Sequence, residues 1–169
     1  MRAEAVLRRG SREDLPLLEP LWVGVHRQHA QVMPEFAPYV DDEQTWSARS
    51  AFYADLLDEP GTILILAEVG QQLAGYGLAR VMPAADTWLA DTWQTGPVIG
   101  EIETIAVLPS YRGQGIGTQV FRQLEQELEA IGVNDYILGV VPNNTDAIRL
   151  YSRLGYRPIW SYLARLSGR

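Results

Sequence analysis

Residues 107–118 read VLPSYRGQGIGT and join an apolar run to a helical pattern. Gly113, Gly115 and Gly117 take alternate positions there, although each glycine inside a helix costs about 1 kcal/mol relative to alanine. A helix N-terminus presents unpaired N–H groups and the positive end of the helix dipole, and glycines let a ligand approach without meeting a Cβ atom. The junction is therefore predicted to bind a phosphate or pyrophosphate. The alternative is that the glycines only form a tight strand-to-helix turn.

Two other kinds of phosphate site are excluded by the residues present. The G-x-G-x-x-G pattern of dinucleotide-binding loops needs a third glycine, but Thr118 stands there when counted from Gly113, and Val120 when counted from Gly115. The phosphate-loop motif depends on a lysine, and every basic residue of this chain is an arginine. The lack of lysine also rules out a Schiff-base mechanism.

Length and composition limit the class of protein. The chain has 169 residues and no repeat or linker that divides it, so residues 1–169 are predicted to form one domain. It has no cysteine, which excludes disulfides, thiolate metal sites and a cysteine nucleophile. The formal net charge of −7 argues against nucleic-acid binding. No apolar run approaches the length of a membrane span and no signal-peptide pattern is present, so we expect no membrane segment and a cytoplasmic location.

Hydrophobic periodicity predicts a mixed α/β chain in the order β-α-α-β-β-β-α-β-α-β. A right-handed crossover is expected from strand 98–107 through helix 115–131 to strand 136–141, which makes these strands parallel. Pro20 lies inside the first predicted helix and is expected to bend it. The predicted elements cover residues 5–9, 11–32, 42–57, 63–69, 73–81, 98–107, 115–131, 136–141, 145–154 and 157–166.

Two motifs carry a family resemblance. Residues 112–117, RGQGIG, resemble the R/Q-x-x-G-x-G/A signature of the GNAT superfamily of acyl-CoA-dependent N-acyltransferases. Residues 144–151, NTDAIRLY, followed by LGY, resemble that family's N-x-x-A-x-x-x-Y…G-F/Y motif in residue type and spacing. The resemblance is close over residues 102–156. It implies a twisted mixed sheet flanked by helices, with an acyl-CoA site between two splayed parallel strands, and acetyl-CoA as co-substrate.

The resemblance also implies roles for particular residues. Tyr151 would donate its proton to the coenzyme A sulfur, and Asn144 would hold the pantetheine arm. The strand before the glycines would present backbone N–H groups of Ile105 and Val107 to the thioester oxygen. The complete set of residues expected to bind the co-substrate is Ile105, Val107, Arg112, Gly113, Gln114, Gly115, Ile116, Gly117, Thr118 and Asn144.

Acyl transfer to an amine also needs a base, because an alkylamine with a pKa near 10.4 is almost wholly protonated at neutral pH. Glu101 and Glu103 share strand parity with Ile105 and Val107, so all four are predicted to lie on one face of the strand. Either glutamate is a candidate base, and the alternative is an exposed strand face with no catalytic part. His26 and His29 lack a third ligand nearby, so no metal site is predicted.

The sequence therefore predicts an acetyl-CoA-dependent N-acetyltransferase that acts by direct attack in a ternary complex. A non-catalytic acyl-CoA-binding sensor is the alternative. An acidic surface is expected around the acceptor site, which favours a small primary amine or a peptide N-terminus as acceptor rather than an anionic or neutral molecule. From the same resemblance, we expect a homodimer. The carboxylates assigned to that surface are Glu35, Asp41, Asp42, Glu101 and Glu103.

Overall fold

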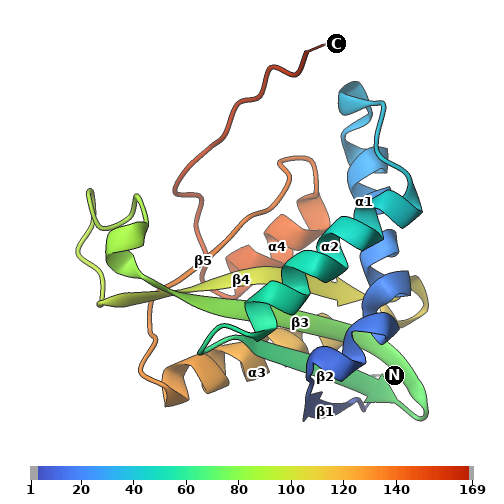
Figure 1. Cartoon of the computed structure of the whole chain (residues 1–169), viewed down its shortest axis with the longest axis horizontal. Helices are drawn as coiled ribbons and strands as arrows, with labels where there is room; N and C mark the ends of the chain where they lie inside the picture. The colour runs from blue at the N-terminus through green and yellow to red at the C-terminus, as the bar shows by residue number, and fades with distance from the viewer. Residues whose placement is uncertain (1–3, 168–169) are drawn as a thin grey trace.

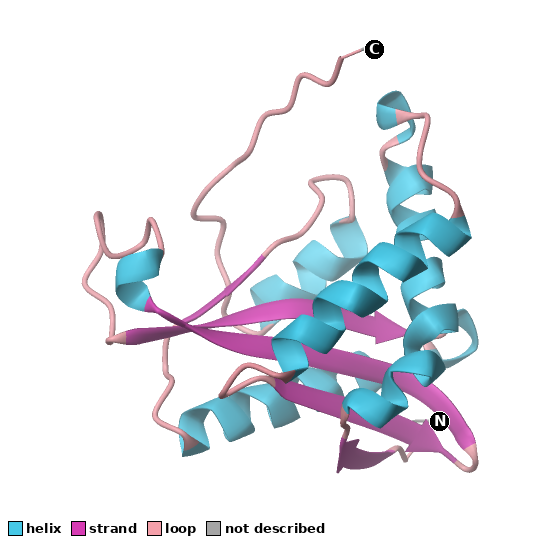
Figure 2. Ribbon diagram, viewed as in Figure 1, coloured by secondary structure: helices cyan, strands magenta, loops and turns pink. Residues whose placement is uncertain are grey.

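The computed structural model describes residues 4–167, and within them five strands form one sheet in the order β1-β2-β3-β4-β5. Neighbouring strands are antiparallel except for β4 and β5, which are parallel. Helices cover both faces of the sheet (Figures 1 and 2). The predicted mixed α/β class is confirmed. The strands and α-helices are β1 Val6–Arg9, α1 Glu19–Val32, α2 Asp42–Leu57, β2 Ile63–Val69, β3 Gln72–Pro83, β4 Val98–Val107, α3 Ile116–Ala130, β5 Tyr136–Leu138 and α4 Thr145–Arg153.

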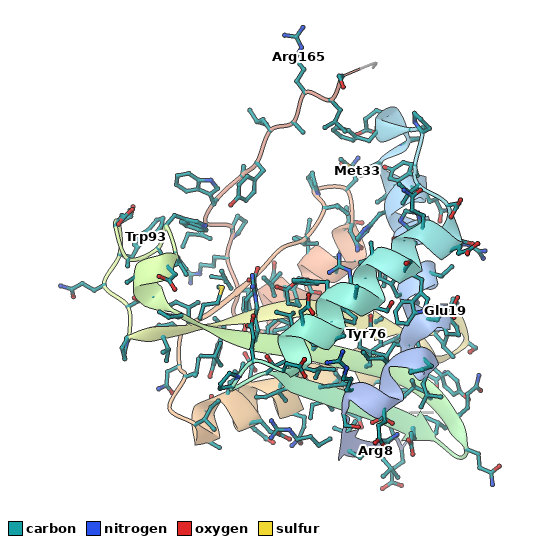
Figure 3. All side chains as sticks on the ribbon, in the orientation of Figure 1. Arg8, Glu19, Met33, Tyr76, Trp93 and Arg165 are labelled. Carbon is teal, nitrogen blue, oxygen red and sulfur yellow. The ribbon has the colours of Figure 1, made fainter. Side chains whose placement is uncertain are left out.

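Alternation along the strands builds an apolar core on each face of the sheet. Ile63 and Ile65 of β2 pack with the buried face of α3, whereas Leu64 and Leu66 pack with α1, α2 and the turn before them. Successive residues of a strand point to opposite faces, which is why one strand serves both cores. Tyr76 of β3 belongs to the second core and lies beneath α2 (Figure 3). We call these the α3 face and the α2 face of the sheet.

The close approach of α3 to the sheet depends on a glycine in β3. A Cβ atom on Gly77 would lie 2.6 Å from Val120 and 2.7 Å from Leu124 of α3. Gly77→Ala is therefore expected to destabilise the protein by about 1–3 kcal/mol through overpacking. The measurement is the urea midpoint at an unchanged slope. The control is Gly24→Ala in α1, where a Cβ atom meets nothing within 4 Å and alanine should leave stability equal or higher.

The first helical region differs from the prediction. Residues Arg12–Leu18 form a 3-10 helix, and α1 starts at Glu19 with Pro20 in its first turn. Proline is tolerated there because the first N–H groups of an α-helix have no partner within it. The expectation that Pro20 bends a longer helix is wrong, since it begins a new one.

Two predicted strands also differ. The strand predicted for residues 136–141 is limited to Tyr136–Leu138, and the last predicted strand, 157–166, is wrong because the structure has none there. The C-terminal segment leads away from the sheet, where Figure 3 labels Arg165. The successive residues Tyr162 and Leu163 are 82% and 98% exposed, so neither side of this segment packs into a core. A strand needs a hydrogen-bonding partner, and this segment lies beside none.

Within residues 4–167, no helix is both long enough and apolar enough to cross a bilayer.

Candidate active site

A β-bulge in β4 decides where the two candidate bases lie. Leu78 of β3 pairs with Thr104, but the next residue, Ala79, pairs with Ile102, so Glu103 is an extra residue in β4. A bulge reverses the alternation of side chains beyond it. Glu103 therefore lies on the α2 face together with Thr104.

The prediction that the glutamates share a face with Ile105 and Val107 is wrong for this reason. Ile105 and Val107 pack against the apolar cluster on the α3 face. Glu101 and Glu103 instead contact Arg80 on the other face. Strand parity counted from the sequence assumes an unbroken alternation, and the bulge breaks it.

Arg80 holds the two glutamates together. Its Nη2 lies 2.7 Å from Oε2 of Glu101, and its Nε lies 2.8 Å from Oε1 of Glu103. The Glu103 side chain is only 12% exposed. Burial and the neighbouring charge of Glu101 raise the pKa of Glu103, while the charges of Arg80 and Arg49 act in the opposite direction. A buried carboxylate with a raised pKa is a typical environment for a general base.

The glycine turn presents a row of unpaired backbone donors. Gly113 and Gly115 have φ of +75° and +88°, a left-handed conformation that residues with a Cβ rarely adopt. In the part of the chain that the structure describes, the N–H groups of residues 113–118 donate no hydrogen bond. The space beside Gly113 is open, since a Cβ atom there would meet nothing within 4 Å. These features fit an anionic group such as a pyrophosphate.

The edge of β4 next to this turn is also unpaired. β5 pairs with β4 only at residues 100–102, and β4 continues to Val107. The N–H of Leu108 donates to Ala74 of β3 at 2.9 Å, so the alternate N–H groups of Ile105 and Val107 point toward the side that β5 leaves open. The carbonyl of Val107 on that side accepts a hydrogen bond from Nε of Arg112 at 3.2 Å. Arg112 thereby ties the glycine turn to the open edge.

Helix α4 brings the second motif to the same place. A Cβ atom on Gly117 would lie 3.9 Å from Leu150 of α4, so α4 packs beside the first turn of α3. Oδ1 of Asn144 caps α4 by accepting from the N–H of Ala147 at 3.3 Å. The structure thus places both sequence motifs side by side on the α3 face.

Tyr151 sits in this helix among aromatic rings. Its ring lies 5.7 Å from that of Phe121 and 6.5 Å from that of Tyr156, between ring centres. Burial raises the pKa of its phenol, so the phenol is protonated at neutral pH. Within residues 4–167 its hydroxyl makes no hydrogen bond, which leaves the proton free to be donated.

The α2 face holds a group of residues that the sequence analysis missed. The hydroxyl of Tyr53 lies 3.1 Å from that of Tyr76 and hydrogen-bonds Thr104 Oγ1. Burial raises the pKa of both phenols. Arg49 of α2 lies over the ring of Trp22, 3.9 Å from its centre. The available signal was Tyr76 and Thr104, hydrogen-bonding residues within otherwise apolar strand patterns.

Two arginines contact part of the acidic surface expected around the acceptor site. Asp42 forms an ion pair with Arg27, and Glu101 and Glu103 share Arg80. Asp41 accepts a hydrogen bond from the N–H of Gln44 as the cap of α2. These two arginines offset part of the charge of the five carboxylates, and sequence spacing does not reveal such ion-pair partners. No three His, Cys, Asp or Glu side chains gather as metal ligands among residues 4–167.

Comparison with known proteins finds similar chains both by sequence and by structure. A model of the acetyltransferase (GNAT) family matches residues 26–156. An N-alpha-acetyltransferase of Sulfurisphaera tokodaii is 29% identical over 111 residues, 64% of each chain. A thialysine N-epsilon-acetyltransferase of Mus musculus is 31% identical over 102 residues, 60% of this chain and 52% of that protein. The matches thus span between about half and two thirds of these curated relatives.

A solved aminoglycoside N-acetyltransferase in complex with CoA is similar to the whole described fold. The TM-score is 0.69 at 16% identity, and the superposition covers 100% of this chain and 98% of that one. At this identity the likeness concerns the fold alone.

Proposed function

Because the chain belongs to the acetyltransferase (GNAT) family, we propose that it transfers an acetyl group from acetyl-CoA to a primary amine. The transfer takes place by direct attack of the amine in a ternary complex, with no covalent enzyme intermediate. The observation that carries this proposal is the row of unpaired N–H groups at residues 113–118 beside the unpaired edge of β4. One element offers an anion site and the other offers donors to a carbonyl oxygen.

The donor site consists of the glycine turn, the open edge and the start of α4. The N–H groups of residues 113–118 bind the pyrophosphate of acetyl-CoA, the group that supplies the acetyl thioester. Ile105 and Val107 donate their N–H groups to the thioester oxygen and so stabilise the charge that develops there. Asn144 contacts the pantetheine arm through its Nδ2 group, since Oδ1 is occupied as a helix cap.

Two side chains move protons in the proposed reaction. Glu103 accepts a proton from the attacking amine, since its raised pKa suits a base that works near neutral pH. Glu101 keeps that pKa raised through its adjacent charge, and Arg80 fixes the position of both carboxylates. Tyr151 donates a proton to the departing thiolate, because its buried phenol is protonated and unbonded.

The acceptor is proposed to be a small amine or a peptide N-terminus. The relatives are named for action on alpha-amino groups and on thialysine, both of which present an amine. The likeness to a CoA-bound fold supports acetyl-CoA as the donor. A homodimer, a cytoplasmic location and the absence of a metal stay predictions.

The test is a screen of primary amines for thiol release from acetyl-CoA, with the acetylated product identified by mass. Release that depends on an amine supports the transferase. Binding of acetyl-CoA without thiol release from any amine would instead indicate the acyl-CoA sensor, which needs the glycine turn but neither Glu103 nor Tyr151.

The pH dependence tests the base. Below its pKa Glu103 is protonated and cannot accept a proton, so kcat/KM should fall as the pH falls through that pKa. Arg80→Gln removes a positive charge that lowers the pKa of Glu103, so the acidic limb of the profile should move to higher pH. The measurement is kcat/KM against pH for one acceptor.

A matched control exists in β1, at the edge of the sheet. Arg8 bridges Asp14 and Glu68 at 2.8 Å each, in the same kind of double ion pair as Arg80. Arg8→Gln should leave the acidic limb where it is. If the acidic limb of the pH profile also stays in place in Arg80→Gln, Glu103 is not the base.

A further inference from the structure

Arg49 is a partly buried cation that has no hydrogen-bonding partner among the described residues. Its guanidinium lies 3.9 Å from the centre of the Trp22 ring, and 5.4 Å and 5.5 Å from those of Phe52 and Tyr53. Nowhere in residues 4–167 does a carboxylate or carbonyl accept a hydrogen bond from it. Stacking fixes the plane of the guanidinium and leaves its N–H groups available.

Several other arginines form ion pairs with carboxylates. Arg8, Arg12 and Arg80 contact carboxylates at 2.5–2.8 Å. A partly buried guanidinium without an acceptor has lost some hydration and has gained no hydrogen bond in return. Arg49 is thus ready to bind an anionic group that reaches it from outside the chain.

The position of Arg49 connects it to the proposed reaction. Arg49 lines a hollow of about 230 Å³ with Trp22, Thr45, Ala48 and Phe52. It acts electrostatically on the carboxylate of Glu103, whose pKa its charge lowers. The two residues form no ion pair within the described chain, so the charge of Arg49 is not taken up by Glu103.

The other residues that line the hollow carry no charge, and Glu103 is a nearby carboxylate on which Arg49 acts. Burial and the charges of His26 and Arg49 lower the pKa of His29, so His29 is neutral at pH 7. The buried phenols of Tyr53 and Tyr76 have raised pKa values and are also neutral. The guanidinium therefore acts as the local cation on an otherwise neutral wall.

We propose that Arg49 and the hollow beside it form a subsite for an anionic group of the acceptor, so that the substrate is a small amine with a carboxylate or phosphonate on the same molecule. This inference rests on the proposed function. The planar guanidinium forms paired hydrogen bonds with such a group, while the amine at the other end of the molecule faces Glu103. The subsite sets specificity, and Arg49 moves no proton.

The test uses acceptors matched in amine and different in charge. γ-Aminobutyrate is compared with its primary amide, and aminopropylphosphonate with aminopropane, so that carboxylate and phosphonate are judged separately. Longer and shorter ω-amino carboxylates measure the span from Arg49 to Glu103. The readouts are kcat and KM from thiol release, and binding of each acceptor by calorimetry in the presence of CoA.

Arg49→Gln is expected to raise the KM of the anionic acceptor by about 10- to 100-fold and to leave the neutral counterpart within about twofold. Arg49→Lys should restore part of the loss, because it keeps the charge without the planar fork. Arg122→Gln removes an exposed arginine from α3 and should change neither acceptor. An equal loss for charged and neutral acceptors would mean that Arg49 only supports α1 and α2, and would overturn the inference.

Binding and turnover separate this inference from the proposed function. If neutral amines are acetylated while the anionic ones gain nothing from Arg49, the transferase holds and the subsite is wrong. If an anionic amine binds through Arg49 without thiol release, the subsite holds and the transferase is wrong. Calorimetric binding that is independent of Arg49 contradicts the subsite whatever the turnover.

Discussion

Tyr151→Phe is expected to lower kcat by about 10²–10⁴-fold while the affinity for acetyl-CoA stays nearly unchanged. The substitution removes only the hydroxyl. That hydroxyl makes no hydrogen bond in residues 4–167, so the packing of the ring against Phe121 should survive and the fold should remain as stable. The loss then reflects the missing proton for the departing thiolate. The measurements are steady-state kinetics with the best acceptor, acetyl-CoA affinity by calorimetry, and the melting temperature.

The control for this experiment is a neighbouring tyrosine. Tyr156 packs against the same Phe121 ring, and its hydroxyl donates to Glu125 at 3.0 Å, away from the proposed chemistry. Tyr156→Phe should change kcat by no more than about twofold, although loss of the hydrogen bond costs stability of about 1 kcal/mol. Turnover of Tyr151→Phe at the level of the unmodified protein would refute the role of Tyr151 as the acid.

Gly115→Glu is expected to abolish the stabilisation by acetyl-CoA. At about 100 times its dissociation constant, acetyl-CoA should stabilise the unmodified protein by roughly 2.7 kcal/mol and raise its melting temperature by about 5–10 °C. A glutamate at position 115 would place bulk and a negative charge at the N-terminus of α3, where the pyrophosphate is proposed to bind. The measurement is the melting temperature with and without acetyl-CoA.

Backbone strain from this substitution is controlled at the other end of the same helix. Gly132 follows α3 with φ of +85°, nearly the value of +88° at Gly115, and a Cβ atom there meets nothing within 4 Å. Gly132→Glu therefore introduces the same charge and a similar strain, and should keep the full acetyl-CoA shift. An undiminished shift in a folded Gly115→Glu variant would contradict the pyrophosphate site.

The arrangement of β4 gives the proposed site two sides with separate tasks. Ile105 and Val107 belong to the α3 face, beside the glycine turn and α4, where the donor is proposed to bind. Glu103 and Arg49 belong to the α2 face, where the acceptor is proposed to bind. The unpaired edge of β4 lies between them, because β5 ends at Leu138. Variants of the two faces should accordingly affect donor and acceptor kinetics separately.

The sequence by itself determined the features that depend on neighbouring residues. Helix α2 and strand β4 have the predicted bounds, and the glycine turn, α3 and α4 fall within one residue of them. Each of these signals is local, since side chains three or four residues apart meet on a helix and a glycine sets its own backbone conformation. Both family motifs lie within such segments, so the fold class and the proposed donor site were readable from the chain.

Only the tertiary structure decided which groups meet on the α2 face. The bulge at Glu103 arises from pairing with β3, about 25 residues earlier in the chain, and it moves both glutamates to the opposite face from the one predicted. Arg80 and Arg49 also meet their neighbours across long stretches of sequence. The prediction of a strand at residues 157–166 was wrong for the same reason. The alternation of residues along the segment does not show which strand it would pair with. Pairing and ion-pair geometry depend on distant residues, and no local pattern encodes them.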